Sequence, residues 1–493
     1  MIISKNIEEN ISSLEALFTD CTDFVKRKFA VGREQPVWVY VAYIDAMTDR
    51  MAIELTVIAP LLRIGAKRST GPRYENAYEL FRDFGIDTAD FNEVDDWNLM
   101  MYFLMAGESV FFIDGFDKAI VVASRAFPNR GIQSADTEVV VHGSREAFNE
   151  VIRFNTALVR RRIRDSNLKV KQSRLGHRSE TDIALMYLAD LVRPAILEEV
   201  ERRLARIDTD AILDSGYVEQ LIEDNWRSVF PQVQMTERPD KAAASILEGR
   251  IVIIVDNSPF VLIVPVTLNS LFQASEDYYD RWQITSFVRI IRYIAAFFAV
   301  ALPGFYLAVT TYHPSMIPLT LTLRMAAARQ PVPFPAVIEI LIMDIAFELL
   351  REAGIRLPRA AGGALGIVGG LIIGQAAVEA GLVSPIVVIV VALAGVSHFA
   401  IPHVSLVAGF RLVKYLVLLL SAGFGLLGFW AGLLIILIHL ASLRSFGMPY
   451  LFPYASPEMN DYSDTKDSFF RLPLFTLKKR PFYANPENTT RMK

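Results

Sequence analysis

The pattern of apolar and charged positions divides the sequence into two halves that meet near Arg289. Before that residue, charged side chains recur every few positions and no long uncharged apolar run occurs. After it, uncharged apolar runs cover residues 293–312, 360–378, 380–410 (with histidines counted as neutral) and 415–438. A helix of about 20 apolar residues spans the ~30 Å hydrocarbon core of a bilayer. The pattern therefore predicts that the second half crosses a membrane.

We expect clear spans at about 293–312, 360–379, 384–401 and 415–440. The stretch 334–350 is apolar but carries Glu339, Asp344 and Glu348, so it is either a fifth crossing buried among other helices or a re-entrant segment. In the last run, a long helix could break into a hairpin at a cluster of glycines. Basic residues flank the helical region on both sides, which predicts cytoplasmic flanks and an even number of crossings. Four spans with one re-entrant segment satisfy that parity, and so do six spans. The flanking basic residues are Arg281, Arg289 and Arg292 before the first span, and Lys478, Lys479 and Arg480 in the tail.

The first half has the pattern of a mixed α/β region. Short runs rich in β-branched and aromatic residues predict strands, and an amphipathic pattern over 195–207, opened by Pro194, predicts a helix. A break near 145–164 divides this half into two subdomains. The expected strands are 38–44, 110–113, 120–123, 139–142, 183–188, 251–255 and 260–264.

The expected fold class is a multi-domain membrane protein, with a soluble N-terminal α/β region of two subdomains followed by an all-α transmembrane bundle. We expect four parts. These are α/β subdomain 1 (1–145), α/β subdomain 2 (146–288), the transmembrane helical domain (289–445) and a cytoplasmic C-terminal tail (446–493).

Composition agrees with this division. Of 493 residues, 52% are hydrophobic and 21% are charged, which excludes a disordered chain. The net charge of −4 and the pI near 6.0 give no reason to expect nucleic acid as a partner. The single cysteine, Cys21, cannot form an intrachain disulfide. The polar, acidic N-terminus does not have the pattern of a signal peptide.

The common catalytic motifs do not predict an enzyme. Gly423, Gly425 and Gly428 match G-x-G-x-x-G, but they lie inside an apolar run, which favours close helix packing over dinucleotide binding. The sequence has no Walker motif, H-E-x-x-H, paired C-x-x-C or G-x-S-x-G. We therefore expect no catalytic residues, no cofactor and no metal site.

The densest run of basic residues lies in the first half, and we interpret it as a solvated helix face. Contact with anionic lipid or with a partner is the alternative. The run consists of Arg160, Arg161, Arg162, Arg164, Lys169, Lys171 and Arg174.

A glycine at every fourth position defines one face of the helix expected after Ala360. These residues, Gly362, Gly366, Gly370 and Gly374, form a small ridge that allows a neighbouring helix to approach closely. The opposite face carries Ala364, Val368, Leu371, Gln375 and Glu379. A carboxylate at mid-membrane costs ~2.5–3.5 kcal/mol or more, so this face should meet water, another polar group or the membrane edge. If several copies surround an axis, Gln375 and Glu379 form polar rings, and Val368 and Leu371 form a constriction. Alternatively, Glu379 caps the helix at the interface.

Asp344 and Glu348 lie four residues apart and share a helix face, which disfavours two like charges unless they are compensated. Arg351 follows one turn after Glu348 and could pair with it. We interpret these residues as a structural ion-pair group; a cation vestibule is the alternative.

Several longer strings resemble the A subunit of spore germinant receptors, the GerA family. They are GSREAFNEVIRFNTALVRRRIRDSNLKV (143–170), TERPDKAAASILEGRIVIIVDNSPFVLIVP (236–265), SEDYYDRW (275–282), PFPAVIEILIMDIAFELLREAGIRLP (333–358), GQAAVEAGLVSP (374–385) and HLASLRSFGMPYLFP (439–453). The family pattern departs at Asn257, where glycine is commoner, and at Asp344, where glutamate is common.

The resemblance implies a multi-pass subunit of the spore inner membrane with both termini cytoplasmic. It also implies action with a B subunit and a lipoprotein C subunit. In the family, the complex senses nutrients and triggers cation release, and A subunits are proposed to oligomerise into the channel. The expected partners are therefore the B and C subunits, further copies of the chain, membrane lipids and monovalent cations, with no nucleic acid.

Our sequence-based hypothesis is a nutrient-gated cation channel subunit that triggers germination. One alternative is a secondary transporter that uses Glu339, Asp344 and Glu348 as a proton or substrate relay. Another is a signalling scaffold that conducts no ions.

Overall fold

The structure, a computed structural model, describes residues 2–32, 36–67, 78, 81–82, 86, 90–126, 135, 138, 140–356, 370, 372–455 and 462–492. The chain forms two compact units. Unit 1 comprises Met1–Glu223, Val233–Pro265 and Lys479–Lys493, and unit 2 comprises Asp224–Gln232 and Val266–Lys478. The main chain thus passes between the units after residues 223, 232, 265 and 478. This division differs from the expected one, because the tail 446–493 is shared between the two units.

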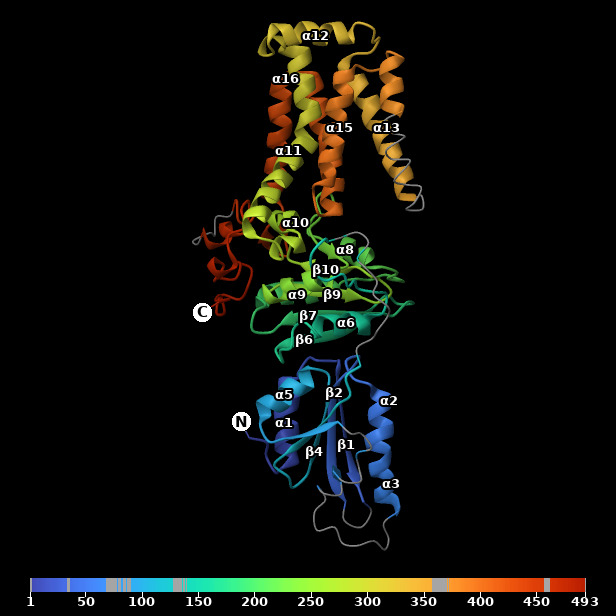
Figure 1. Ribbon diagram of the computed structural model, residues 1–493, viewed down its shortest axis with the longest axis vertical. Coiled ribbons are helices and arrows are strands. Elements are labelled where there is room, and N and C mark those ends of the chain that lie inside the picture. The colour runs from blue at the N-terminus through green and yellow to red at the C-terminus, as the bar shows by residue number, and fades with distance from the viewer. Residues whose placement is uncertain are drawn as a thin grey trace. The chain divides into compact units, whose positions relative to one another are not determined.

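The described residues of unit 1 form two antiparallel sheets of five strands each. The first has the order β1-β2-β4-β5-β3. Helices α1 and α5 cover one face, and α2, α3 and the π-helical turn between them (Glu54–Ile58) cover the other (Figure 1). The elements are α1 (Ile7–Leu17), β1 (Phe24–Val31), β2 (Val37–Ile44), α2 (Arg50–Ile53), α3 (Ala59–Lys67), β3 (Phe91–Val94), α5 (Trp97–Met105), β4 (Ser109–Ile113) and β5 (Ala119–Val122).

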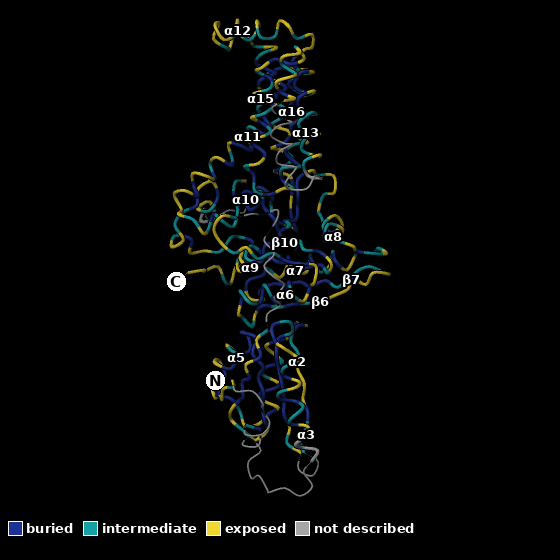
Figure 2. Tube along the Cα trace, turned by 45° about the vertical axis from the view of Figure 1, so that its right-hand side comes forward, coloured by how far each residue is buried: buried dark blue, intermediate teal, exposed yellow. Residues whose placement is uncertain are grey.

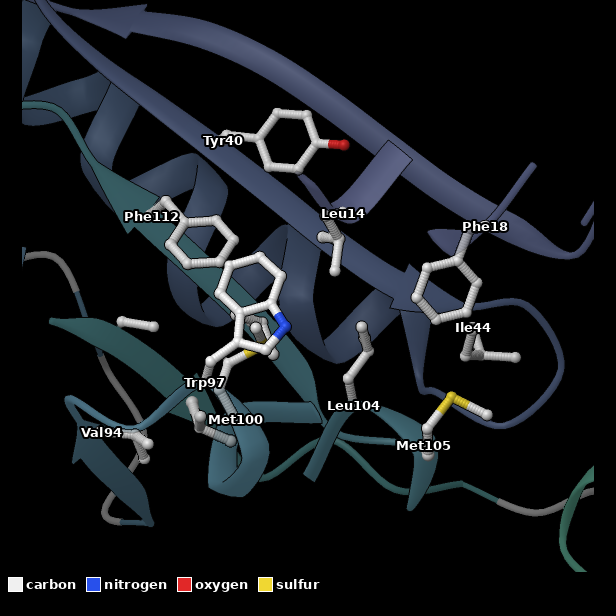
Figure 3. Close-up of a cluster of buried hydrophobic side chains, with 14 of the residues drawn as sticks. Leu14, Phe18, Tyr40, Ile44, Val94, Trp97, Met100, Leu104, Met105 and Phe112 are labelled. Carbon is white, nitrogen blue, oxygen red and sulfur yellow. The ribbon is translucent and has the colours of Figure 1, made fainter. Parts of the chain in front are cut away.

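Alternation along β2 explains why both faces of this sheet are covered. Val39 and Val41 belong to one apolar cluster, and Tyr40 and Ala42 belong to the other. Side chains on a strand alternate between its two faces, so a strand that is apolar at every position needs a layer of helices on each side. Figure 3 shows the cluster on the α1 and α5 side, where Trp97 lies against Phe112 with ring centroids 6.2 Å apart.

The second sheet has the order β6-β7-β9-β10-β8, and its central strands are buried throughout. Helices α6 and α9 pack on it and share its apolar cluster. The elements are α6 (Ile152–Arg160), β6 (Leu168–Leu175), β7 (Thr181–Leu188), α7 (Pro194–Leu204), α8 (Ser215–Ile222), β8 (Gln234–Thr236), α9 (Pro239–Leu247), β9 (Ile251–Val255) and β10 (Val261–Val264).

The expected strands agree with β2, β4, β5, β7, β9 and β10, and the expected helix agrees with α7. The strand expected at 139–142 is wrong for its described part, since residues 140–142 lie outside any strand. The sequence did not indicate β1, β3, β6 or β8. In β6, Lys169 and Lys171 alternate with the buried Leu168 and Val170, a strand pattern that the density of charge obscured.

The basic run is therefore not one solvated helix face. Its later members, Lys169, Lys171 and Arg174, lie on β6, and Arg160 at the end of α6 is fully buried. The Arg160 guanidinium donates two hydrogen bonds to the carboxylate of Asp23, one of them 2.8 Å long from Nη2 to Oδ1. Near this pair, Thr22 N donates to the Val170 carbonyl over 3.0 Å. A buried ion pair thus joins the segment before β1 to the second sheet.

Helix α8 carries a carboxyl group with a perturbed pKa. Burial raises the pKa of Glu219 to about 7, and the nearby charges of Glu223 and Asp214 act in the same direction. The carboxyl of Glu219 therefore stays protonated to a higher pH in the folded chain than in the unfolded chain, where its pKa has the ordinary value of about 4.5. The resulting contribution to stability is complete below about pH 4.5 and is lost as the pH rises through about 7.

We expect Glu219→Gln to remove this loss, because an amide does not ionise. Thermal unfolding of the full chain in detergent at about pH 5 and about pH 8 measures the effect. The melting temperature of the variant, relative to that of the native chain, should be higher at about pH 8 than at about pH 5. Glu198→Gln, on the exposed side of α7, is the matched control. Identical pH responses of the native chain and Glu219→Gln would contradict the assignment.

Unit 2 is mainly helical, and two of its helices, α11 and α16, are long and apolar enough to cross a membrane. Helix α12 has no buried residue (Figure 2). The elements are α10 (Leu268–Phe272), α11 (Trp282–Tyr312), α12 (Leu319–Arg329), α13 (Ala336–Arg356), α15 (Pro385–Phe399), α16 (Val404–Ser442), β11 (Arg444–Ser445) and β12 (Met448–Pro449), with a further helical stretch at 372–379.

Helix α16 reverses direction at Gly425, where φ is 60° and ψ is −136°. Its two halves then run antiparallel: Phe230 lies against both Phe410 in the first half and His439 in the second, with centroids 5.9 and 6.0 Å apart. A side-chain carbon at Gly428 would overlap the carbonyl oxygen of Leu420. The G-x-G-x-x-G glycines therefore serve a tight helical hairpin, and the span expected at 415–440 is in fact two helical segments that start at Val404.

We expect Gly425→Ala to destabilise this hairpin. Its Cβ would lie 2.9 Å from Cβ and Cγ of Tyr312, and the backbone conformation is one that alanine avoids at a cost of about 1–3 kcal/mol. The melting temperature and yield of the purified chain in detergent measure the loss.

Gly423→Ala is the control, because nothing lies within 4 Å of its added carbon. Equal stability of the Gly425 and Gly423 variants would show that the hairpin does not require glycine at residue 425.

The arginines at the start of α11 are buried rather than free. Arg289 Nε donates to Asp277 over 2.8 Å and Arg289 Nη1 donates to Asp467 over 2.7 Å, while Arg292 Nη1 donates to both carboxylate oxygens of Asp277 over 2.8 Å. Tyr278 Oη also donates to Asp467 over 2.6 Å. Two of the basic residues used to predict orientation are therefore neutralised within unit 2, which leaves Arg281 exposed at this flank.

Candidate functional site

Helix α13 carries three acidic side chains into the apolar helices of unit 2, and each has a cationic partner. These are the residues that the sequence singled out as intramembrane acids, Glu339, Asp344 and Glu348. Glu339 and Asp344 are buried, and Glu348 is partly buried. We call this group and its partners the charge network.

Glu339 is fully buried where α12, α13 and α15 come together. Its carboxylate accepts a 2.8 Å hydrogen bond from the backbone N–H of Ser384, the residue that precedes the first turn of α15. Arg329 Nε, at the end of α12, donates to it over 3.3 Å. A helix N-terminus and a guanidinium both stabilise an anion, so this carboxylate is suited to remain charged.

Asp344 pairs with Lys414 across two helices. Lys414 Nζ donates to Asp344 Oδ1 over 2.6 Å, and both side chains are less than a tenth exposed. Lys414 lies in the first half of the α16 hairpin, and its ammonium is also 5.1 Å from the ring centroid of Tyr415. A charge left alone in this surrounding would be costly, so each partner requires the other.

Glu348 lies one turn beyond Asp344 and meets two arginines. Arg351 Nη2 donates over 2.7 Å from the same helix, and Arg411 Nη1 donates over 3.1 Å from α16. Arg411 and Lys414 are three residues apart, which places them on one face of α16 opposite the two carboxylates. The pairing of Glu348 with Arg351 that the sequence predicted is thus confirmed. The sequence-based prediction missed Arg411 and Lys414, because it placed them between the spans expected at 384–401 and 415–440.

The glycine-ridged helix is described only in part. Ala364, Val368, Leu371, Gly362 and Gly366 lie outside the described residues. Gly370 and Gly374 face neighbouring helices: a side-chain carbon at these positions would be 3.7 Å from Phe347 of α13 and 3.5 Å from Val388 of α15. The small face of the described part therefore packs inward.

The other side of the stretch 372–379 is uncovered in the single chain. Gln375 and Glu379 are exposed, and Gln375 Nε2 donates to Glu379 Oε1 over 2.8 Å. Ile372 and Ile373 are exposed on the same outward half. The described part of this helix thus joins a polar pair and two large apolar side chains on one free surface.

No group of three or more metal-ligating side chains occurs among the described residues. The arrangement consists instead of a helical unit with paired interior charges and an exposed carboxylate on its outer surface. These features define a helix-bundle protein with candidate membrane-crossing helices and an appended α/β region.

The sequence matches the family described as Bacillus/Clostridium GerA spore germination protein over residues 12–483. Spore germination protein KA of Bacillus subtilis (strain 168) is 39% identical over the whole of this chain and 89% of its own length. Spore germination protein GerLA of Bacillus cereus is 42% identical over 78% of each chain. The chain therefore belongs to the GerA family of spore germination proteins.

The chain is also similar to a further curated relative and to a solved domain. YfkQ of Bacillus subtilis (strain 168), named as an uncharacterized membrane protein, is 40% identical over 97% of this chain and 91% of its own length. The crystal structure of the N-terminal domain of the A subunit of the Bacillus megaterium spore germinant receptor GerK3 is 32% identical. It covers 53% of this chain and 96% of that domain, with a TM-score of 0.42.

We expect Lys414→Met to destabilise unit 2 by about 3–5 kcal/mol, because it leaves the buried carboxylate of Asp344 without a cation. Removing both charges in the pair Asp344→Asn, Lys414→Met should restore most of that loss. The melting temperature of the purified chain in detergent measures both changes.

Arg351→Met is the control, since Glu348 keeps Arg411 and the 351–348 pair is about one third exposed. It should cost no more than about 1 kcal/mol. A double variant no more stable than Lys414→Met would show that the pairing does not hold these helices.

Proposed function

We propose that this chain is the A subunit of a spore nutrient germinant receptor and that its helical unit lies in the spore inner membrane. Copies of the chain assemble there around a cation pathway, which opens when the receptor binds a nutrient. Membership of a spore germination family supports the role in germination. The length and apolar character of α11 and α16, together with the printed name of YfkQ, support the membrane location.

One observation carries the pathway proposal: the two sides of the helix at 370–379. Its glycines pack against α13 and α15, while Gln375 and Glu379 on the other side are exposed and are not covered by the part of the chain that the structure describes. A carboxylate facing lipid costs ~2.5–3.5 kcal/mol or more, so this side must contact water or other polar groups. Assembly of several copies around a water-filled axis would supply it and would also cover Ile372 and Ile373.

The paths of the helices support termini on one side of the membrane. Phe230 meets both the first half and the last turn of α16, and Phe272 meets both Phe410 of α16 and Tyr293 of α11. The chain therefore enters α11 and leaves α16 at the same end of unit 2. This arrangement supports an even number of crossings, with both termini cytoplasmic in our proposal.

The charge network supports the channel hypothesis over the transporter alternative. A proton or substrate relay needs a carboxylate that can gain and lose its partner. Glu339, Asp344 and Glu348 each already bind a cationic side chain. We assign them to holding the helices together. The B subunit, the lipoprotein C subunit, lipids and monovalent cations remain the proposed partners.

We expect Glu379→Gln to lower cation flux without changing protein level, because it removes a negative charge from the pathway. A loss of about 1.4 kcal/mol of attraction corresponds to roughly a tenfold decrease. Potassium flux through proteoliposomes that contain the assembled receptor, with candidate nutrients added, measures it.

Gln375→Glu is the matched opposite change, one turn before Glu379, and should raise the preference for cations over anions. If both variants conduct like the native receptor at equal protein levels, this helix face does not line the pathway.

A further inference from the structure

Residues 224–232 form a closed loop, which we call the anchor loop. The side chains and backbone of its ends bind each other: Gln232 Nε2 donates to the Asn225 carbonyl over 2.8 Å, and Asn225 N donates to Gln232 Oε1 over 2.9 Å. Phe446 N donates to Asp224 over 2.8 Å and Ser445 Oγ donates to the Gln232 carbonyl over 2.8 Å, which fixes the loop to the strand after α16. The residues between these ends are therefore held in place.

The anchor loop packs against both ends of the α16 hairpin. The hydroxyl of Ser228 lies 3.0 Å from His439 Nε2 in the last turn, and the ring of Phe230 lies 5.9 Å from Phe410 in the second turn. The Val229 carbonyl comes so close to Gly409 that a side-chain carbon there would lie 2.8 Å from it. The loop is thus located at the level where these apolar helices begin and end.

That level coincides with the edge of a bilayer if α11 spans one. Phe410 contacts Phe272, which stacks on Tyr293 of α11 with centroids 4.4 Å apart. From Tyr293 to Tyr312, α11 rises about 28 Å at 1.5 Å per residue, close to the thickness of the hydrocarbon core. Tyr312 is 46% exposed at the far end. The anchor loop therefore lies beside the near boundary of the core.

The loop presents apolar and cationic side chains outward at this level. Trp226 is 77% exposed and Val229 is 40% exposed. The Arg227 guanidinium lies 5.0 Å from the centroid of the Trp226 ring. Arg227 and Arg444, the latter at the strand that holds the loop, are both exposed, and neither has a carboxylate partner among the described residues. The last residue of α15, Phe399, is 80% exposed.

We propose that the anchor loop binds the lipid headgroup region, with Trp226 inserted among the headgroups and Arg227 and Arg444 on lipid phosphates. Tryptophan is enriched at this depth because its ring is apolar and its N–H is polar, and basic residues near the surface attract anionic lipid. This inference rests on the membrane location proposed above. It names a lipid surface as the partner of a loop whose flanking segments both belong to unit 1.

Fluorescence of single-tryptophan variants of the full chain tests the proposal, because the other tryptophans provide controls. In each variant, all tryptophans but one are changed to phenylalanine, and the protein is reconstituted in phosphatidylcholine vesicles that carry brominated acyl chains. Trp430, which is 64% exposed in the second half of α16, reports membrane insertion, and Trp97, buried in unit 1, reports background.

We expect lipids brominated near the headgroup to quench Trp226 and to leave Trp97 unaffected. Adding phosphatidylglycerol should increase the quenching, and Arg227→Gln with Arg444→Gln should reduce that increase. Gly409→Ala, which displaces the Val229 carbonyl, should lower quenching of Trp226 while Trp430 stays quenched.

Two results would refute lipid binding by the anchor loop without contradicting the proposed membrane location. In one, Trp430 is quenched while Trp226 responds only to aqueous iodide, so the loop lies in water. In the other, neither bromolipid nor iodide reaches Trp226, so the loop is covered by protein. Absence of quenching for Trp430 as well would instead refute the proposed membrane location.

Discussion

The pairing of buried charges is the constraint on which the helical unit depends. Helices that lie in lipid gain little from burying one another's apolar side chains, so close packing and polar contacts hold them together. In unit 2, Asp344 with Lys414 joins α13 to α16, and Glu339 joins α13 to the start of α15. Removing one member of a buried ion pair destabilises the fold, because the other charge is left buried without a partner.

The same rule explains the first turns of α11. Arg289 and Arg292 would be expensive on an apolar helix, but Asp277 and Asp467 neutralise them inside unit 2. The outward side of these turns then carries no charged residue and is mostly apolar, with Ile284 and Phe287 56% and 64% exposed. Charges turned inward and apolar side chains turned outward are the reverse of the pattern on a water-soluble helix, which suits a surface in contact with lipid or another subunit.

The sequence predicted those parts of the fold whose signal is local. Buried central strands such as β9 are continuous runs of β-branched residues, and their bounds agree with the prediction. Strand β6 was missed because its lysines alternate with buried residues inside a dense basic run. The pairing of Glu348 with Arg351 lies within one helix and was predictable, whereas Lys414 reaches Asp344 from seventy residues away in the sequence. No spacing rule within one segment records such a contact.

The hairpin at Gly425 lies between these cases. Three glycines in an apolar run indicated that a break was possible, but their spacing alone did not choose between a straight packed helix and a reversal. The reversal is favoured by the close approach of the two halves, where Gly428 meets Leu420, and by the packing of the Tyr312 ring at the turn. Both are properties of the assembled unit.

Residues 479–485 belong to unit 1 although they follow the helices of unit 2 in the sequence, which affects the order in which unit 1 can form. Tyr483 is buried in unit 1, where its hydroxyl accepts a 2.7 Å hydrogen bond from Arg250, and Asn485 N donates to the Leu191 carbonyl over 2.8 Å. A ribosome synthesises this segment only after every helix of unit 2. Unit 1 therefore has part of its interior open to solvent until residues 479–485 have been synthesised, and a nascent chain stopped after Pro265 lacks a piece of the unit 1 core.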